Sequence, residues 1–181
     1  MSRHAPKERR QRQQSVSSDF VNDALSGSGQ PLSAETRALV EPKFGHSFAN
    51  VRIFADDAAR ETTSALNAKA FTVGENIAFN AGRYNPDSVE GQRLLTHELS
   101  HTIQQGPAPQ LPHELEVSHP HDAGERGAHD AVSSIHQGFS PNLSPASSGA
   151  SVQLEPEEEE MQGSFTFGGS SAAPEEEELQ M

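Results

Sequence analysis

The stretch Gly91–Gly106, GQRLLTHELSHTIQQG, is the most informative part of the chain because it contains the spacing His-Glu-x-x-His. On a helix, residues four positions apart lie one above the other on the same face. His97 and His101 can therefore both reach one metal ion, with Glu98 beside them. The stretch predicts a metal site on a helix.

Zinc chemistry explains why these residue types are needed together. Neutral imidazole nitrogens bind Zn²⁺ without cancelling its charge, so a water in an open coordination position loses its proton near neutral pH. A neighbouring carboxylate can accept that proton. His97 and His101 are the candidate ligands and Glu98 is the candidate catalytic base. A core helix could carry the pattern by chance, but the chain's own His and Glu frequencies give roughly 0.05 expected matches, which favours the metal site.

The flanking residues predict the limits of this helix. Asp87 is the expected N-cap, with Glu90 three residues later to complete a capping box. Gly106 followed by Pro107 predicts the end. A mostly apolar flank predicts that one side of the helix is buried while the histidines face a cleft; it consists of Leu94, Leu95, Leu99, Thr102 and Ile103.

The residues before this helix predict an α+β domain. Residues 51–55 alternate as a strand does, and residues 70–73 and 77–80 form a β-hairpin around a turn at 74–76. An order of helix, strand, helix, hairpin and helix is typical of the α+β class. The expected helices are Ser18–Leu25, one after the N-cap Ser33 that Pro42 kinks or ends, and one capped by Asp56 or Asp57.

The predicted hairpin has two interpretations. An edge strand beside a metal can pair with an extended peptide through backbone hydrogen bonds and hold the scissile bond near the metal. Alternatively, the hairpin only covers the core. The sequence does not show which strand is the edge, so both interpretations stay open.

A zinc site of this kind needs a third protein ligand. A continuation His-x-x-Gly-x-x-His is absent, because Gln104 stands where its glycine would be and Pro107 where its third histidine would be. The alternative is a carboxylate from a following helix. The segment 122–136, DAGERGAHDAVSSIH, has a second helical pattern, and Glu125 is the preferred third ligand.

Other residues in or near the segment 122–136 compete with Glu125. His129 lies one turn further along the same face, where it can orient a ligand or serve as one. His121, Asp122 and Asp130 are further candidates. The simpler alternative is a solvated amphipathic helix that only packs against the domain.

The composition indicates that only the middle of the chain is globular. Its 181 residues are 33% hydrophobic, which is low for a chain packed throughout. There is no cysteine, so any Zn²⁺ must be held by histidine and carboxylate. No apolar run is long enough to span a membrane and no secretory signal follows the N-terminus. We therefore expect synthesis in the cytoplasm, no membrane partner, and a non-classical route for any export.

The two ends of the chain are strongly charged. Residues 1–17 form a basic arm, expected to be disordered and solvated rather than bound to nucleic acid. Residues 138–181 are expected to be a linker and a disordered acidic tail, in which EPEEEEMQ at 155–162 recurs as APEEEELQ at 173–180. Such acidic blocks are usually only solvated, but the repetition makes a recognition motif the alternative. The folded domain is then expected at 18–137.

The chain resembles a bacterial family of zincin-like domains, regarded as zinc metallopeptidases, that occur with toxins and with extracellular contractile injection systems. The resemblance covers residues 31–105 and rests on PLSAETRALVEPKFGHSFANVRIFAD and AFTVGENIAFNAGRYNPDSVEGQRLLTHELSHTIQQ. The downstream segment DAGERGAHDAV adds to it. The resemblance implies a small zincin-like metallopeptidase domain with His97 and His101 as ligands and Glu98 as the catalytic carboxylate.

The downstream helix matches this family only in part. The family pattern is Asp-Pro-x-Glu-x-Glu-Ala-Asp, and here Asp122, Glu125 and Ala128 match it. Gly127 replaces the second glutamate and His129 the final aspartate. Glu125 is thus the only glutamate that fits the pattern. Acidic stretches ending in Glu-Leu-Gln-Met also recur in such proteins, so the tail agrees with the resemblance.

Three functions follow as hypotheses. The first is a zinc endopeptidase in which Glu98 takes a proton from water and passes it to the leaving amine, with Tyr84 or a downstream histidine stabilising the oxyanion. The second is an adaptor or cargo-loading module that binds without catalysis. The third is self-processing of the chain's own linker or of an attached partner. The expected partners are a peptide or protein substrate and, through the acidic tail, a toxin or an injection machine.

Overall fold

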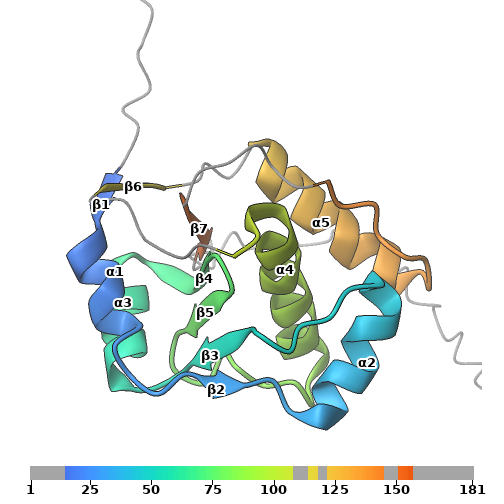
Figure 1. Ribbon diagram of the computed structural model, residues 1–181, viewed down its shortest axis with the longest axis horizontal. Helices are drawn as coiled ribbons and strands as arrows, with labels where there is room; N and C mark the ends of the chain where they lie inside the picture. Colours follow the sequence, from blue (N-terminus) through green and yellow to red (C-terminus); the bar gives the residue numbers. More distant parts are fainter. Residues whose placement is uncertain (1–14, 108–113, 118–121, 145–150, 157–181) are drawn as a thin grey trace, which may run out of the picture.

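The computed structural model describes residues 15–107, 114–117, 122–144 and 151–156. The centre of the fold is a seven-stranded mixed sheet in the order β1-β6-β7-β4-β5-β3-β2 (Figure 1). The β3–β5 and β6–β7 pairs are parallel and the others are antiparallel. The strands are β1 (Ser15–Ser17), β2 (Gln30–Pro31), β3 (Arg52–Phe54), β4 (Ala68–Val73), β5 (Asn76–Phe79), β6 (Glu114–Val117) and β7 (Ser151–Pro156).

Helices cover both faces of this sheet. Along β4 the side chains alternate, so Phe71 and Val73 join the core on the face covered by α1 and α3, while Ala70 joins the core beneath α4. Helix α5 lies beside α4 (Figure 1). This arrangement confirms the α+β class. The helices are α1 (Ser18–Ala24), α2 (Ala34–Phe44), α3 (Asp57–Ala65), α4 (Val89–Gln105) and α5 (Ala123–His136).

The described part of the chain contains no helix with both the length and the apolar character that crossing a lipid bilayer requires.

The predicted caps of α2 and α3 are confirmed. Ser33 accepts a hydrogen bond from the Thr36 amide at 3.0 Å, and Asp56 accepts one from Ala59 at 3.0 Å. Helix α2 continues past Pro42 to Phe44, so the proline lies in its last turn and the helix ends shortly after it. Gly45, with φ of 62°, ends the helix in a left-handed conformation.

The start of α4 differs from the prediction by one residue. The N-cap is Ser88, not Asp87, and the Ser88 hydroxyl accepts a hydrogen bond from the Gly91 amide at 3.0 Å. This shift makes Glu90 the second helical residue, where it forms an exposed ion pair with Arg83 at 3.4 Å instead of a capping box. The predicted end at Gly106 is confirmed.

Three strands lie where the sequence predicted irregular chain. β1 lies in the predicted arm, β6 in the proline-containing stretch 107–121 between α4 and α5, and β7 in the predicted linker and tail. Each is short and depends on pairing with a strand distant in sequence, which local patterns do not reveal. The alternation in β7 is nevertheless visible, because Val152 and Leu154 alternate with the polar residues Ser151, Gln153 and Glu155. The rest of the predicted arm, 1–14, and of the acidic tail, 157–181, lies outside the described residues.

Neither strand of the predicted hairpin is a sheet edge. β4 pairs with β5 on one side and with β7 on the other. β5 is likewise enclosed, between β4 and β3. The free edge that one of the two interpretations required is therefore absent from the described hairpin, because the chain's own β7 pairs with β4.

Candidate metal centre

Helix α4 places the two histidines of the motif next to each other in the protein interior. The exposed fraction is 3% for His97 and 0% for His101. Their Nε2 atoms lie 3.1 Å apart, and their rings meet nearly edge to face at 80°. Because the residues are one helical turn apart, the same backbone geometry fixes both side chains.

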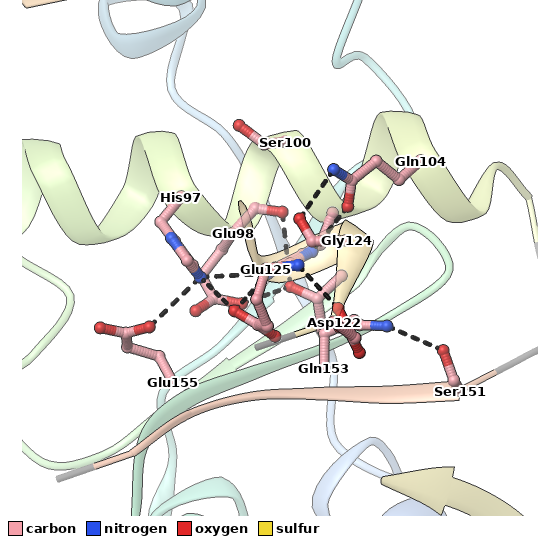
Figure 2. Close-up of polar contacts among 12 residues, drawn as sticks. His97, Glu98, Ser100, Gln104, Asp122, Gly124, Glu125, Ser151, Gln153 and Glu155 are labelled. Atoms are coloured by element: carbon pink, nitrogen blue, oxygen red, sulfur yellow. Dashed lines mark hydrogen bonds and ion pairs between the residues drawn. The ribbon is translucent and has the colours of Figure 1, made fainter. Parts of the chain in front are cut away.

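Helix α5 adds Glu125 to this pair. Its Oε2 atom lies 3.2 Å from His97 Nε2 and 3.5 Å from His101 Nε2, and Glu125 is only 2% exposed. Asp122, which was a candidate ligand, is the N-cap of α5, and its Oδ1 accepts the Glu125 amide at 2.8 Å. The cap thus begins the helix at the position that directs Glu125 toward the histidines (Figure 2).

The spacing of these three donor atoms fits zinc. With metal–donor bonds of about 2.0–2.2 Å, neighbouring donors of a tetrahedral site lie about 3.3–3.6 Å apart. The three observed separations are 3.1, 3.2 and 3.5 Å. His97, His101 and Glu125 can therefore occupy three corners of one tetrahedral site with shifts of a few tenths of an ångström.

Glu98 lies beside this site without joining it. It is fully buried, and its Oε2 accepts a hydrogen bond from the Thr72 hydroxyl at 2.6 Å. Its Oε1 has no hydrogen-bond partner among the described residues. A buried carboxylate oxygen without a partner is costly unless a water or an ion satisfies it. This oxygen is therefore the atom of Glu98 that still needs a hydrogen-bond donor.

Burial and charge act in opposite directions on the carboxyls. Burial raises the pKa of Glu98 to about 7, although the positive charges of His97 and His101 oppose the rise. Burial would also raise the pKa of Glu125, but hydrogen bonds from His101 and His97 lower it to about 2. Glu125 is consequently ionised at neutral pH, as a metal ligand must be, whereas Glu98 can gain or lose a proton there.

The pKa of His97 shows the same competition. Burial lowers it, but the hydrogen bond to Glu125 and the charges of Glu98, Glu155 and Glu125 together raise it above its ordinary value. A concentration of negative charge that favours imidazolium also favours any other cation at the same position. The electrostatics of the site therefore suit a metal ion.

Gln104 is a site residue that the sequence analysis missed. Its Oε1 accepts a hydrogen bond from His101 Nδ1 at 2.9 Å, which leaves Nε2 of that ring to face Glu125. Its Nε2 donates to the Gly124 carbonyl at 3.0 Å and so links α4 to the first turn of α5. A Cβ at Gly127 would lie 2.8 Å from this amide nitrogen, so the glycine provides the space. The available signal was the i, i+3 spacing from His101.

A second carboxylate reaches the site from β7. Glu155 Oε2 lies 3.2 Å from His97 Nε2, so Glu125 and Glu155 approach the same ring from α5 and β7 (Figure 2). Potential donor atoms of His97, Glu125, His129 and Glu155 all lie within 4.8 Å of one another. This 4.8 Å limit exceeds the spacing of about 3.3–3.6 Å between donors of a tetrahedral zinc site. His97, His101 and Glu125 therefore form the more compact set of donors. Glu155 belongs to no motif with fixed spacing, and the sequence analysis missed it as a donor.

A cleft of about 230 Å³ reaches the site at His97, His129 and Glu155, whereas Glu98, His101 and Glu125 are buried behind its lining. Its polar lining includes the cations Lys69 and Arg93 as well as the carboxylates Glu90 and Glu155. The complete lining is Lys69, Glu90, Arg93, Leu94, His97, His129, Val132 and Glu155.

The remaining candidate residues lie elsewhere. Tyr84 packs against Phe79 with ring centroids 5.2 Å apart, does not line the cleft, and has its pKa raised by burial. Asp130 is exposed on α5 and is absent from the donor cluster. His121 lies outside the described residues. The structure thus brings together His97, Glu98, His101, Glu125 and His129, but not Tyr84 or Asp130.

Comparison with known proteins gives one match. No curated protein and no solved structure matches the chain. Residues 31–109 match the family model described as the eCIS core domain. The matched segment contains α4 and its His-Glu-x-x-His motif, while Glu125 and Glu155 lie beyond it. This match to residues 31–109 supports an association of the protein with extracellular contractile injection systems.

Proposed function

We propose that the protein is a zinc-dependent endopeptidase that acts with, or as cargo of, a contractile injection system. One observation carries the proposal: three donor atoms at tetrahedral spacing lie beside a buried carboxylate that has one oxygen without a partner. His97, His101 and Glu125 would hold the metal. When bound, zinc would act as a Lewis acid, making water a better nucleophile and polarising a peptide carbonyl.

Glu98 would perform the proton transfers. Its Oε1 would take the proton from the attacking water and later give it to the leaving amine. Thr72 holds the other oxygen at 2.6 Å, so the carboxylate cannot rotate freely. A pKa of about 7 suits a group that must both accept and donate a proton near neutral pH.

Replacement of the catalytic carboxylate tests this mechanism. Glu98→Gln retains an oxygen for Thr72 but cannot accept the proton, so we expect unchanged zinc content and a loss of peptide cleavage of about 10²–10⁴-fold. The matched control is Glu61→Gln, which alters an exposed glutamate on α3 that does not line the cleft. Zinc per chain and cleavage of a fluorogenic peptide library are the measurements. Equal cleavage by Glu98→Gln and the unaltered protein would reject the mechanism.

A binding function is the second candidate. Structural zinc sites are closed by four protein donors, and Glu155, 3.2 Å from His97, is available as the fourth. In that case the fold would serve as an adaptor or cargo-loading module. Replacing the glutamates at 157–160 and 175–178 by glutamine should then abolish association with the injection particle, whereas Glu98→Gln should leave it intact. The opposite pattern would exclude this function.

A further inference from the structure

Strand β7 is an internal strand of the sheet and carries Glu155, which contacts the candidate metal centre. β7 pairs antiparallel with β4 on one side and parallel with β6 on the other. Without β7, the sheet would divide into β1–β6 and β4-β5-β3-β2, and β4 would be an exposed edge. β7 therefore fills a position that an added strand from elsewhere could also take.

Strand β4 is connected to the motif helix α4 by side-chain hydrogen bonds. Thr72 donates to the Glu98 side chain, and the Thr72 carbonyl accepts a hydrogen bond from Gln105 at 3.3 Å. The Gly74 amide just beyond β4 donates to Gln105 at 2.7 Å. An extended peptide paired along this strand would pass directly beside the metal donors. β7 follows this path.

The register of β7 directs its polar side chains toward the site. Glu155 pairs with Ala70 and Gln153 pairs with Thr72, and both β4 residues face α4. Leu154 pairs with Phe71 and packs with Val152 on the opposite face. The alternation of the strand thus separates an apolar face that anchors β7 from a polar face that meets the donors.

Anchoring β7 does not require a carboxylate at position 155. The apolar face already provides the anchor, since Val152 is fully buried. Glu155 begins the first acidic repeat, EPEEEEMQ, and the second copy, APEEEELQ, has Ala173 at the equivalent position. The first copy therefore differs from the second by a carboxylate at the residue that contacts His97.

A β-bulge lies next to this contact. The register between β4 and β7 shifts between Ala68 and Ala70, so Lys69 lies at the irregularity. Lys69 lines the same cleft as Glu155 and Arg93. Bulges beside sites commonly redirect a side chain and end regular pairing. The two cations face two carboxylates, Glu90 and Glu155, in this lining, so the cleft has an excess of positive charge only when Glu155 is displaced.

We propose that Ser151–Pro156 takes the place that an extended substrate peptide would occupy on β4. Glu155 then takes the fourth donor position of the metal site. This conformation is therefore the closed form of the enzyme. The inference rests on the proposed function, because it assumes a metal held by His97, His101 and Glu125. Catalytic zinc sites keep one position open, and a fourth protein carboxylate closes it. A substrate must then displace Glu155. The position that β7 occupies on β4 would suit an extended peptide with an apolar residue in place of Leu154 and an acidic residue in place of Glu155.

Access to the metal measures this occupation without relying on catalysis. The full chain loaded with Co²⁺ is titrated with acetohydroxamate, a small metal-binding probe, and the visible absorption of the ion is followed. We expect Glu155→Ala to bind the probe at least about tenfold more tightly than the unaltered protein, since one donor no longer competes. Glu155→Gln should resemble Glu155→Ala, because the amide is a poor metal ligand. Glu90→Ala, which removes another carboxylate from the same cleft, should bind like the unaltered protein.

Two results would overturn the proposal. Equal probe affinity in Glu155→Ala and the unaltered protein would show that Glu155 does not occupy the ion. Loss of stoichiometric Co²⁺ from a Glu155→Ala variant with native circular dichroism would show a permanent ligand rather than a displaceable one. Failure of the proposed function would look different, since the unaltered protein would then bind no Co²⁺, or Glu98→Gln would keep full activity.

Discussion

At the scale of single residues, the site depends on side chains that hold the ligands as well as on the ligands themselves. His101 can present Nε2 because Gln104 accepts the proton on Nδ1, and Gln104 can reach that position because residue 127 is a glycine. Gly127, which stands where the family pattern has a glutamate, therefore leaves space for the contact of Gln104 on α4 with Gly124 on α5. Residues that orient metal ligands in this way tune metal affinity.

Removal of this orienting contact should weaken zinc binding. We expect Gln104→Ala to lower zinc affinity about 10–100-fold, the usual effect of losing a partner of a ligating histidine. Gln104→Glu retains an oxygen acceptor for His101 Nδ1 and should restore much of the affinity. Competition with a chromophoric chelator gives the measurement, and Gln92→Ala, an exposed glutamine on the same helix, is the control. Affinities of Gln104→Ala and Gln92→Ala that are indistinguishable would argue against the orienting role.

The buried carboxyl of Glu98 predicts a pH dependence of stability in the zinc-free protein. Its pKa is about 7 in the folded protein against an ordinary value of 4.5, so between these values the folded state keeps a proton that the unfolded state loses. The carboxyl therefore costs stability progressively as pH rises from 4.5 to 7. Glu98→Gln avoids this cost, and its advantage in free energy of unfolding should grow across that window to at most about 3 kcal/mol. Urea unfolding in chelator checks this, and a pH-independent difference would contradict it.

At the scale of elements, sequence patterns predicted best where the determinants are local. The motif helix, the caps of α2 and α3, and the β4–β5 hairpin were all recognisable from caps, turns and alternation. Glu125 could be proposed as a donor because its helix carries one glutamate that fits the pattern. Glu155 could not, because its position depends on the pairing of β7 with β4, some 80 residues away in sequence, as long-range pairing generally does.

The N-cap of α4 is Ser88 in the structure, whereas the sequence predicted Asp87. The hydroxyl of Ser88 caps the Gly91 amide, while Asp87 is exposed. We expect Ser88→Ala to lower stability by about 1 kcal/mol, and Asp87→Ala to change it by less than about 0.5 kcal/mol. Chemical denaturation of both variants makes the comparison. A larger loss for Asp87→Ala would restore the predicted cap and move the helix start by one residue.

At the scale of the whole molecule, the candidate metal centre is formed by parts of the chain that are distant in sequence. The matched segment, 31–109, supplies both histidines and Glu98, whereas α5 supplies Glu125 and β7 supplies Glu155. A metal bound here would connect all of them and would stabilise the folded state by mass action. The matched segment by itself would then hold an incomplete set of donors, which α5 and β7 complete.

The central claim is that one Zn²⁺ is held by His97, His101 and Glu125. A crystal structure of the zinc-loaded chain, with anomalous differences measured on both sides of the zinc absorption edge, tests it most directly. We expect one zinc per chain, with His97 Nε2, His101 Nε2 and a Glu125 carboxylate oxygen each about 2.0–2.2 Å from the ion. An ion held without His101 or Glu125, or no zinc between these residues, would contradict it.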